Sequence, residues 1–224
     1  KGLMENFQYI LPEIFISIVI MLFLLVGVFK KNSASLIYNL SNISLVILLA
    51  LIINLSSLDT IYLFNNSYLI DNLSNYMKII LVGSGIFVML TGSKYIQVIN
   101  LNKIEYPILI LSSILGMMIM ISSNDLIVFY MGLELQSLAL YVLASFNRDN
   151  LLSTESGLKY FVLSALSSGL LLYGCSLTYG FSESTNFDQI LINSTEFNYG
   201  TTFGIVFILV GLAFKISAVP FHMW

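Results

Sequence analysis

Seven long apolar runs constrain what this 224-residue chain can fold into more than any other feature of its sequence. A transmembrane helix needs roughly 20 mostly apolar residues, and each run is close to that length. The runs cover about 12–29, 35–57, 77–99, 107–123, 126–146, 155–180 and 202–224, and the two longest polar segments between them are 58–76 and 181–200. A transmembrane β-barrel would alternate apolar and polar residues over about ten positions, and these runs do not. The sequence therefore predicts an all-α, polytopic bundle of about seven transmembrane helices.

The composition supports this reading and excludes several other classes. The chain is 58% hydrophobic and only 9% charged, whereas soluble domains carry roughly a quarter charged residues. So few charges cannot cover a water-facing surface, sustain a disordered segment or neutralise a nucleic acid. The net charge is −3, and the single cysteine excludes an intrachain disulfide. The lipid bilayer is the partner that this composition predicts, and no nucleic acid is expected.

Loop charges predict how the bundle is oriented. Basic residues follow the odd-numbered runs, while acidic residues dominate the other face, where Lys78 is the nearest base. The first set is Lys30, Lys31, Lys94, Lys103 and Arg148, accompanied by Glu105, and the second is Asp59, Asp71, Glu183, Asp188 and Glu196. Because Lys and Arg mark the cytoplasmic side, we expect the N-terminus to lie outside.

The chain ends do not read as those of a complete protein. No cleavable signal is visible, and Met4 would be a natural start. Trp224 ends the chain inside or just after the seventh run, with no closing loop. The sequence therefore reads as a fragment or as the first piece of a split protein.

Three ionisable residues lie within apolar runs, namely Glu134, Lys159 and Lys215. A charge deep in the bilayer costs a few kcal/mol even on lenient insertion scales, so it marks a functional site by default. From the helical rise, Glu134 should lie about 14 Å and Lys215 about 21 Å from the outer face. We expect the two to meet, either as a static ion pair that fixes helix packing or as a pair that handles protons. Burial weakens a lysine's hold on its proton and an opposite charge strengthens it, so a lysine with a movable partner acts as a switch.

Lys159 is a weaker candidate from its spacing alone. It follows Glu155 by four residues, an order that suits an ordinary pair on one helix face. It also lies close to the inner end of its run. Spacing therefore favours a surface lysine whose charge reaches the membrane interface.

Pro220 predicts that the seventh helix is broken just after Lys215. Proline has no N–H, so in a continuous helix the carbonyl of Ile216 would lose its partner, and Ser217 could supply one. Interrupted helices of this kind form ion sites in transporters. His222 follows two residues later and reads either as a capping or packing residue or as a proton relay.

Other chemistry-bearing residues receive structural interpretations. Asp125 opens the fifth run and is typical of a helix N-cap. Cys175 is most simply a small buried side chain, and the remaining small residues of the sixth run suit close helix approach; these are Gly157, Ser164, Ser168 and Gly174. The sequence contains no phosphate-binding loop, haem ligand pair or iron–sulfur cysteine set. We therefore expect no metal and no cofactor on this chain.

Three stretches resemble a known family. They are SSNDLIVFYMGLELQSLALYVLASF over 122–146, STESGLKYFVLSALSSGLLLYGCSLTYGF over 153–181 and GLAFKISAVPFHMW over 211–224. They are similar to the antiporter-like subunit N of bacterial respiratory complex I and to its mitochondrial counterpart, subunit 2 of NADH:ubiquinone oxidoreductase. The similarity is dense over 105–224 and weaker over 1–104.

This resemblance implies a fold, a set of roles and a place in an assembly. It implies preamble helices over 1–104 and a truncated first inverted repeat of an antiporter-like fold over 105–224. The family's buried glutamate falls on Glu134 and its broken-helix lysine on Lys215, while Lys159 falls on the buried polar axis and His222 on the PFHxW motif. The second repeat is absent, which questions whether this chain alone could pump.

The function implied is that of a membrane-arm subunit coupling electron transfer from NADH to quinone to proton translocation. NADH, FMN, Fe–S clusters and quinone would be bound by other subunits, and the other membrane-arm subunits would be its partners. A stand-alone cation/proton antiporter subunit is the alternative, and a purely structural membrane subunit is a further one. The bacterial plasma membrane is the expected location, with the mitochondrial inner membrane as the alternative.

Overall fold

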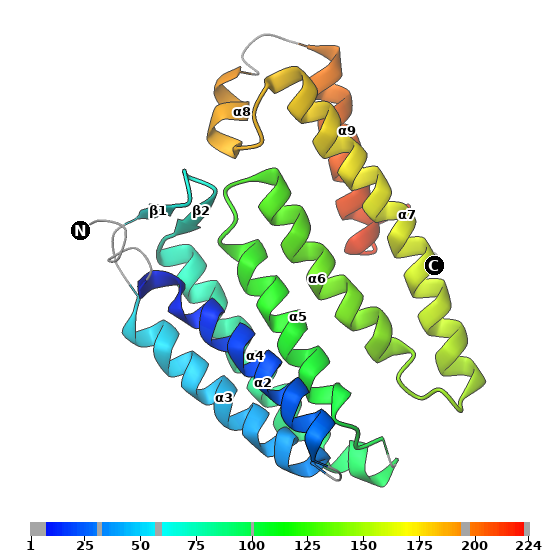
Figure 1. Ribbon diagram of the computed structural model, residues 1–224. Coiled ribbons are helices and arrows are strands. Elements are labelled where there is room, and N and C mark those ends of the chain that lie inside the picture. Colours follow the sequence, from blue (N-terminus) through cyan, green and yellow to red (C-terminus); the bar gives the residue numbers. More distant parts are fainter. Residues whose placement is uncertain (1–7, 31–32, 57–59, 100, 194–197, 222–224) are drawn as a thin grey trace.

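The computed structural model describes residues 8–30, 33–56, 60–99, 101–193 and 198–221, and these are mainly helical (Figure 1). A single 3₁₀ turn, η1 (Gln8–Ile10), leads into the first long helix. The α-helices are α2 (Leu11–Phe29), α3 (Ala34–Asn54), α4 (Asn72–Val98), α5 (Glu105–Ile121), α6 (Leu126–Ala144), α7 (Leu151–Ser182), α8 (Phe187–Asn193) and α9 (Tyr199–Lys215). The strands β1 (Ile61–Leu63) and β2 (Tyr68–Ile70) form an antiparallel hairpin between α3 and α4.

Helix lengths confirm the prediction of a polytopic membrane bundle. Five described helices, namely α2, α3, α4, α6 and α7, are long and apolar enough to cross a membrane, and α5 and α9 are shorter apolar helices. The two long polar segments differ from the expectation because they contain structure. The first holds the hairpin and the start of α4, which begins at Asn72 rather than near residue 77, and the second holds α8.

Side-chain caps explain where several helices begin. The Asp71 carboxylate accepts the Ser74 N–H at 2.8 Å, while the Ser74 hydroxyl accepts the Asp71 N–H at 2.9 Å, forming a capping box. Asp125 accepts the N–H groups of Ile127 and Val128 at the start of α6, which confirms its reading as an N-cap. Asn150 and Asn198 cap α7 and α9 in the same way.

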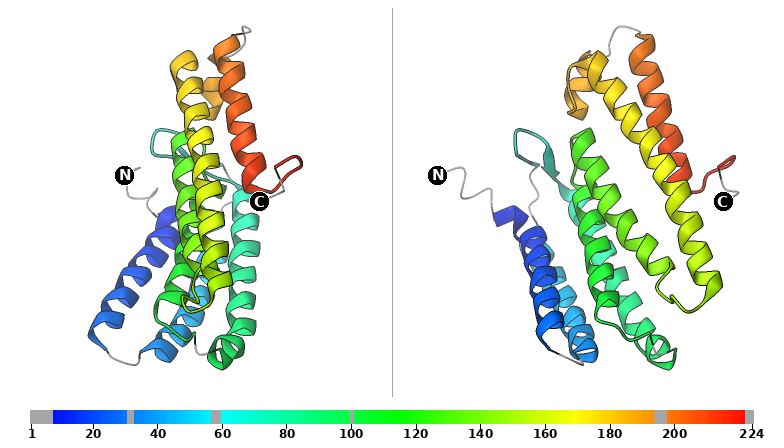
Figure 2. Two further views of the ribbon diagram at one scale, coloured as in Figure 1. Left: turned by 90° about the vertical axis from the view of Figure 1, so that its right-hand side faces the viewer. Right: turned by 45° about the vertical axis from the view of Figure 1, so that its right-hand side comes forward.

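The helices pack in two groups that meet through α6. One apolar cluster joins α2, α3, α4 and α5, and a second joins α6, α7 and α9. Both views in Figure 2 place α7 and α9 side by side. Glycines allow the closest approaches, since a Cβ on Gly116 of α5 would lie 2.6 Å from the Gln136 nitrogen of α6. The predicted small-residue contact at Gly174 is also present, against the backbone of Gly204 and Ile208 on α9.

Helix α9 ends near the predicted position, but Pro220 is not the reason that it ends there. The helix ends at Lys215, so the Ile216 carbonyl is not freed within a helix that continues to Pro220. The Ala218 N–H donates to the Ala213 carbonyl at 2.9 Å and the Ser217 N–H to the Phe214 carbonyl at 3.2 Å. Ser217 has a φ of 52°. This is a Schellman cap, which satisfies the last carbonyls and ends the helix before the proline is reached.

Candidate functional site

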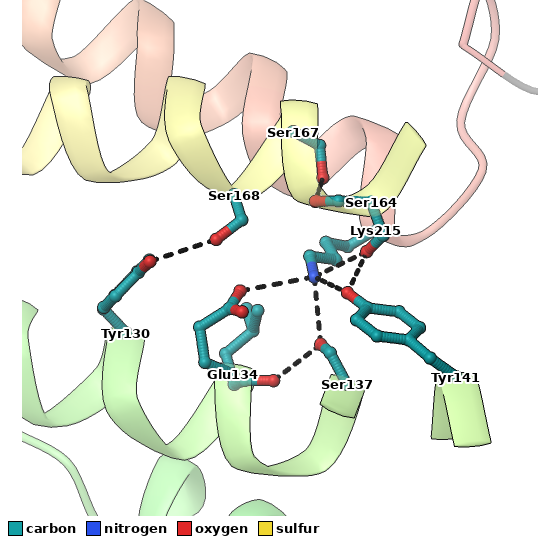
Figure 3. A network of polar contacts seen from close by, with 9 residues as sticks. Tyr130, Glu134, Ser137, Tyr141, Ser164, Ser167, Ser168 and Lys215 are labelled. Carbon is teal, nitrogen blue, oxygen red and sulfur yellow. Dashed lines mark hydrogen bonds and ion pairs between the residues drawn. The ribbon is translucent and has the colours of Figure 1, made fainter. Parts of the chain in front are cut away.

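The Nζ atom of Lys215 lies where α6, α7 and α9 converge (Figure 3). As the last residue of α9, Lys215 extends its side chain across to α6 and α7. Its Nζ atom lies 2.9 Å from the Ser137 Oγ, 3.0 Å from the Tyr141 OH and 2.8 Å from the Ser164 Oγ. It also faces the Tyr141 ring, with 5.6 Å to the ring centre. Three hydroxyl oxygens thus accept the three N–H bonds that a lysine ammonium offers.

Glu134 completes the site from α6. Its Oε1 atom lies 3.5 Å from the Lys215 Nζ, with side-chain exposures of 19% for the glutamate and 13% for the lysine. The structure therefore brings together the two residues that the sequence predicted to meet. The separation is longer than the 2.7–2.9 Å usual for a charge-assisted hydrogen bond, so the hydroxyls hold the ammonium more closely than the carboxylate does.

The hydroxyls are themselves linked to one another and to the backbone. The Tyr141 OH donates to the Ser164 Oγ, and the Ser137 hydroxyl donates to the Leu133 carbonyl at 2.7 Å. We call the three hydroxyls of Ser137, Tyr141 and Ser164 the hydroxyl cage. A hydroxyl can donate or accept, so this cage can pair with either the charged or the neutral form of a lysine.

Two further polar contacts extend the site along α7. The Ser167 hydroxyl donates to the Ser164 carbonyl at 2.9 Å. One turn further, the hydroxyls of Ser168 and Tyr130 lie 3.1 Å apart, joining α7 to the first half of α6. Figure 3 shows this second contact on the far side of Glu134 from Tyr141. Polar groups therefore line the α6–α7 contact over more than one helical turn.

A small pocket with about 10 Å³ of space for water, enough for about one molecule, opens beside the lysine between α7 and α9. Its polar lining is formed by Ser164, Ser167 and Lys215, and its apolar lining includes Leu163 and Phe214. A pocket that reaches a buried ammonium and two serines can admit water to the site.

Most residues of the hydroxyl cage were not predicted from the sequence as parts of the site. Ser164 was interpreted as a small residue for helix packing, and neither Ser137 nor Tyr141 was singled out. A usable signal was present, because Glu134, Ser137 and Tyr141 follow the i, i+3, i+7 spacing that places residues on one helix face.

The structure places the other predicted site residues elsewhere. Lys159 lies on an exposed face of α7, 62% exposed, and pairs with Glu155 at 2.5 Å, as its spacing favoured. Ser217 and Pro220 belong to the turns that follow α9 and not to a helix. His222 lies outside the described residues.

A second buried ion pair, which the sequence analysis missed, lies in the other helix group. The Lys78 Nζ is 2.7 Å from the Glu13 Oε1, with side-chain exposures of 4% and 7%. The sequence analysis took Lys78 as the base nearest to the acidic loops and did not connect it with Glu13, because each lies near the start of its helix. The folded chain buries both against the hairpin, which supplies the Tyr68 hydroxyl to the same carboxylate oxygen at 2.8 Å.

The described residues were compared for side chains that could hold a metal ion together. Across 8–30, 33–56, 60–99, 101–193 and 198–221, no three His, Cys, Asp or Glu side chains gather in a way that could hold a metal ion. Cys175 is buried in α7, as its interpretation as a small apolar side chain predicted.

The helical bundle has the fold of the antiporter-like membrane subunits. Residues 123–224, somewhat under half of the chain, match the family model described as NADH:quinone oxidoreductase/Mrp antiporter, TM. The resemblance to subunit N is confirmed by curated relatives. The chain is 66% identical over 223 residues to NADH-quinone oxidoreductase subunit N of Pelagibacter ubique, covering 99% of this chain and 47% of that protein. It is 48% identical over 219 residues to the same subunit of Rhodospirillum rubrum, covering 96% and 45%.

Solved structures show the same fold at lower sequence identity. A chain of respiratory complex I from Thermus thermophilus with bound aureothin matches with a TM-score of 0.79 and 23% identity, covering 95% of this chain and 45% of that one. A chain of the Mrp complex from Dietzia matches with a TM-score of 0.76 and 19% identity, covering 96% and 42%. The chain thus spans about half the length of the curated relatives it matches. The relatives are bacterial, which supports a multi-pass protein of the bacterial inner membrane.

Proposed function

We propose that this chain is part of a membrane-arm subunit of a proton-pumping NADH:quinone oxidoreductase, in which Glu134 and Lys215 form a proton-handling pair. The single observation that carries the proposal is the Lys215 ammonium held between a carboxylate and three hydroxyls inside the membrane bundle. Residues of this chain bind no redox group in the proposal. NADH, FMN, Fe–S clusters and quinone belong to other subunits, and the other membrane-arm subunits are its partners.

The geometry supports a change of protonation more than a permanent ion pair. In the charged form, the three N–H bonds of Lys215 are accepted by the cage, and Glu134 supplies an opposite charge at 3.5 Å. If Glu134 moves away or becomes neutral, the charged lysine loses stabilisation and can release its proton. The amine left behind needs one donor, and a cage hydroxyl can rotate to provide it. The neutral lysine is therefore not left as an unpaired buried polar group, which would cost about 1–3 kcal/mol.

A static pair would be built differently. A buried ion pair that only fixes helix packing is most stable with short, direct contacts and no pocket beside it. Here the carboxylate is the most distant of the four partners, and the pocket between α7 and α9 reaches the lysine. The pair is close enough for each charge to influence the other, yet it is not locked.

Lys159, His222 and the turn after α9 have supporting roles in this proposal. Lys159 lies about 7.5 Å along α7 from Ser164 and about 140° around the helix from it, so a proton leaving the cage would reach it only through water or a neighbouring helix. In this chain Lys159 is exposed and paired with Glu155, and its role requires a neighbouring helix to cover that face. His222, together with Ser217 and Pro220, would connect water to the lysine from the end of α9.

The orientation and the division of the chain are also proposed. Lys30, Lys94, Lys103 and Arg148 lie at the end of the bundle opposite to Asp71, Glu183 and Asp188. Because Lys and Arg are enriched on the cytoplasmic side, we infer that the first end faces inward and the N-terminus faces outward. We divide the chain into preamble helices over 1–104 and part of an antiporter-like repeat over 105–224, and the family match over 123–224 falls in the second part.

Purification of the full-length subunit from its host tests the assembly, and substitution tests the pair. The proposal predicts co-isolation with a complex that contains flavin and iron. A cofactor-free assembly driven by sodium would favour the stand-alone antiporter that the family description also covers. In the assembled complex, Lys215→Ala should abolish most coupled quinone reduction. Normal activity with normal assembly would leave only a structural role for the pair.

A further inference from the structure

The second ion pair joins three elements that are distant in sequence. Glu13 lies in the first turn of α2, Lys78 in the second turn of α4, and Tyr68 in β2. The Glu13 Oε1 accepts both the Lys78 ammonium at 2.7 Å and the Tyr68 hydroxyl at 2.8 Å, and Lys78 lies 3.3 Å from that hydroxyl. The lysine also faces the Tyr68 ring at 5.2 Å. We call these three residues the hairpin clamp.

Tyr68 is a donor in this clamp at all ordinary pH values. Burial, reinforced by the negative charge of Glu13, raises the pKa of the Tyr68 phenol well above its usual value of 10. Its hydroxyl therefore keeps its proton and donates it to the carboxylate. Both described donors of the clamp converge on Oε1, and neither is directed to the other carboxylate oxygen.

The Oε2 atom of Glu13 is buried and has no hydrogen-bond partner within the chain as described. Oxygens of buried carboxylates are normally satisfied, so such an atom requires an explanation. A second polar atom in the same condition is the Nδ2 of Asn75, a residue that is 8% exposed. Asn75 precedes Lys78 by three residues on α4, and residues with this spacing lie on the same helix face. The Ser122 side chain lies in the same corner, beside the Tyr68 hydroxyl, and the Ser122 carbonyl accepts the Leu69 N–H.

The Glu13 Oε2 and the Asn75 Nδ2 have complementary hydrogen-bonding capacity. A carboxylate oxygen can only accept, and an amide nitrogen can only donate. A water molecule accepts and donates, so a single water lying between these two atoms would satisfy both. Buried waters make roughly two to four hydrogen bonds, so these two partners are enough to hold one.

Ions fit this position poorly. A cation at Oε2 would lie close to the Lys78 ammonium, which is already 2.7 Å from the neighbouring oxygen of the same carboxylate. An anion would meet the carboxylate itself. A small neutral molecule with both donor and acceptor groups is the ligand that this chemistry selects.

We propose that the hairpin clamp binds one internal water molecule, which accepts a hydrogen bond from Asn75 and donates one to the Oε2 of Glu13. This water is part of what holds the hairpin onto α2 and α4. The site shares no residue with the Lys215 cage and does not depend on the proposed function. The water also affects packing beyond the clamp, because the hairpin that it holds contacts the segment just before α6. There the Ser67 carbonyl accepts the Asn124 N–H at 2.9 Å.

A structure of the full-length subunit in its assembled complex, at a resolution that shows ordered water, tests the proposal directly. We expect one water within hydrogen-bond distance of both the Glu13 Oε2 and the Asn75 Nδ2. A metal ion, a lipid headgroup or a side chain of another subunit at Oε2 would overturn the proposal, as would an oxygen with nothing beside it.

Hydrogen–deuterium exchange of the hairpin amides gives a second test in the same complex. Asn75→Leu removes the water's donor, so exchange over 61–70 should become several-fold faster. Asn42→Leu is the matched control, since Asn42 also carries a buried amide atom without a partner but lies on α3, where its Nδ2 donates to the Tyr38 carbonyl. The control should leave hairpin exchange within about twofold of the unchanged protein. Equal exchange rates in the two variants would contradict the role of the water.

Discussion

Neutralising Glu134 and Lys215 singly and together should separate the stability of their pair from its function. The Nζ and Oε1 atoms are 3.5 Å apart in a largely buried site, which gives an attraction of about 4.7 kcal/mol at an effective dielectric constant of 20. Desolvation offsets much of this attraction. Removing one partner of a buried pair nevertheless costs about 3–5 kcal/mol, because the other charge is left uncompensated.

The structure predicts that the two single variants lose different amounts of unfolding free energy. Lys215→Met leaves the Glu134 carboxylate without its counter-charge and should destabilise the protein by about 3 kcal/mol. In Glu134→Gln the lysine keeps its three cage hydroxyls, so the loss should be nearer to about 1 kcal/mol. The double variant contains neither charge and should be more stable than Lys215→Met by about 2 kcal/mol, because a neutral pair of similar volume avoids the uncompensated charge.

Two assays on the same variants complete this experiment. Denaturant unfolding of the full-length subunit in lipid, followed by circular dichroism, measures the free energies. Coupled quinone reduction by the assembled complex measures function, and all three variants should be impaired, because none retains a proton-holding lysine beside a charged glutamate. Recovery of activity together with stability in the double variant would refute the proton-handling role. A double variant no more stable than Lys215→Met would show that the two charges do not interact.

Three further changes test the fold by thermal unfolding of the full-length protein. Asp125→Ala removes the N-cap of α6 and should cost about 1 kcal/mol, whereas Asp149→Ala in an exposed loop should have little effect; equal losses would contradict the assigned cap. Gly116→Ala places a Cβ against the backbone of α6 and should cost about 1–3 kcal/mol or more, while Gly83→Ala, with open space around it, should not destabilise. Ser217→Gly relieves a residue with a φ of 52° and should stabilise by up to about 1 kcal/mol, and destabilisation would argue against the Schellman cap.

The parts of the fold that the sequence predicted are those governed by local hydrophobicity and by the cost of burying charge. Apolar length located the membrane helices, and Asp125 was correctly interpreted as a cap. Glu134 and Lys215 could be paired because each lies too deep to reach water from its helix. These inferences need only the position of a residue along its own element.

The features that were missed depend on contacts between distant elements. Glu13 and Lys78 lie near helix ends, where charges are ordinarily exposed, and only the hairpin that folds over them makes the pair buried. The hairpin itself is indicated by apolar, β-favouring residues on both sides of Asn65 and Asn66, but the polar loop around it concealed that pattern. The end of α9 was assigned to Pro220, although local hydrogen bonding around Ser217 ends the helix first.

Proton translocation by the assembled complex in lipid vesicles tests the central claim most directly, with Lys78→Met as the control for Lys215→Met. Both substitutions remove a lysine from a buried ion pair, but only Lys215 lies in the proposed proton site. We predict that vesicles containing the Lys215→Met complex lose most of their proton uptake together with their quinone reduction, while those containing the Lys78→Met complex retain both once assembled. Undiminished proton uptake with Lys215→Met would contradict the account.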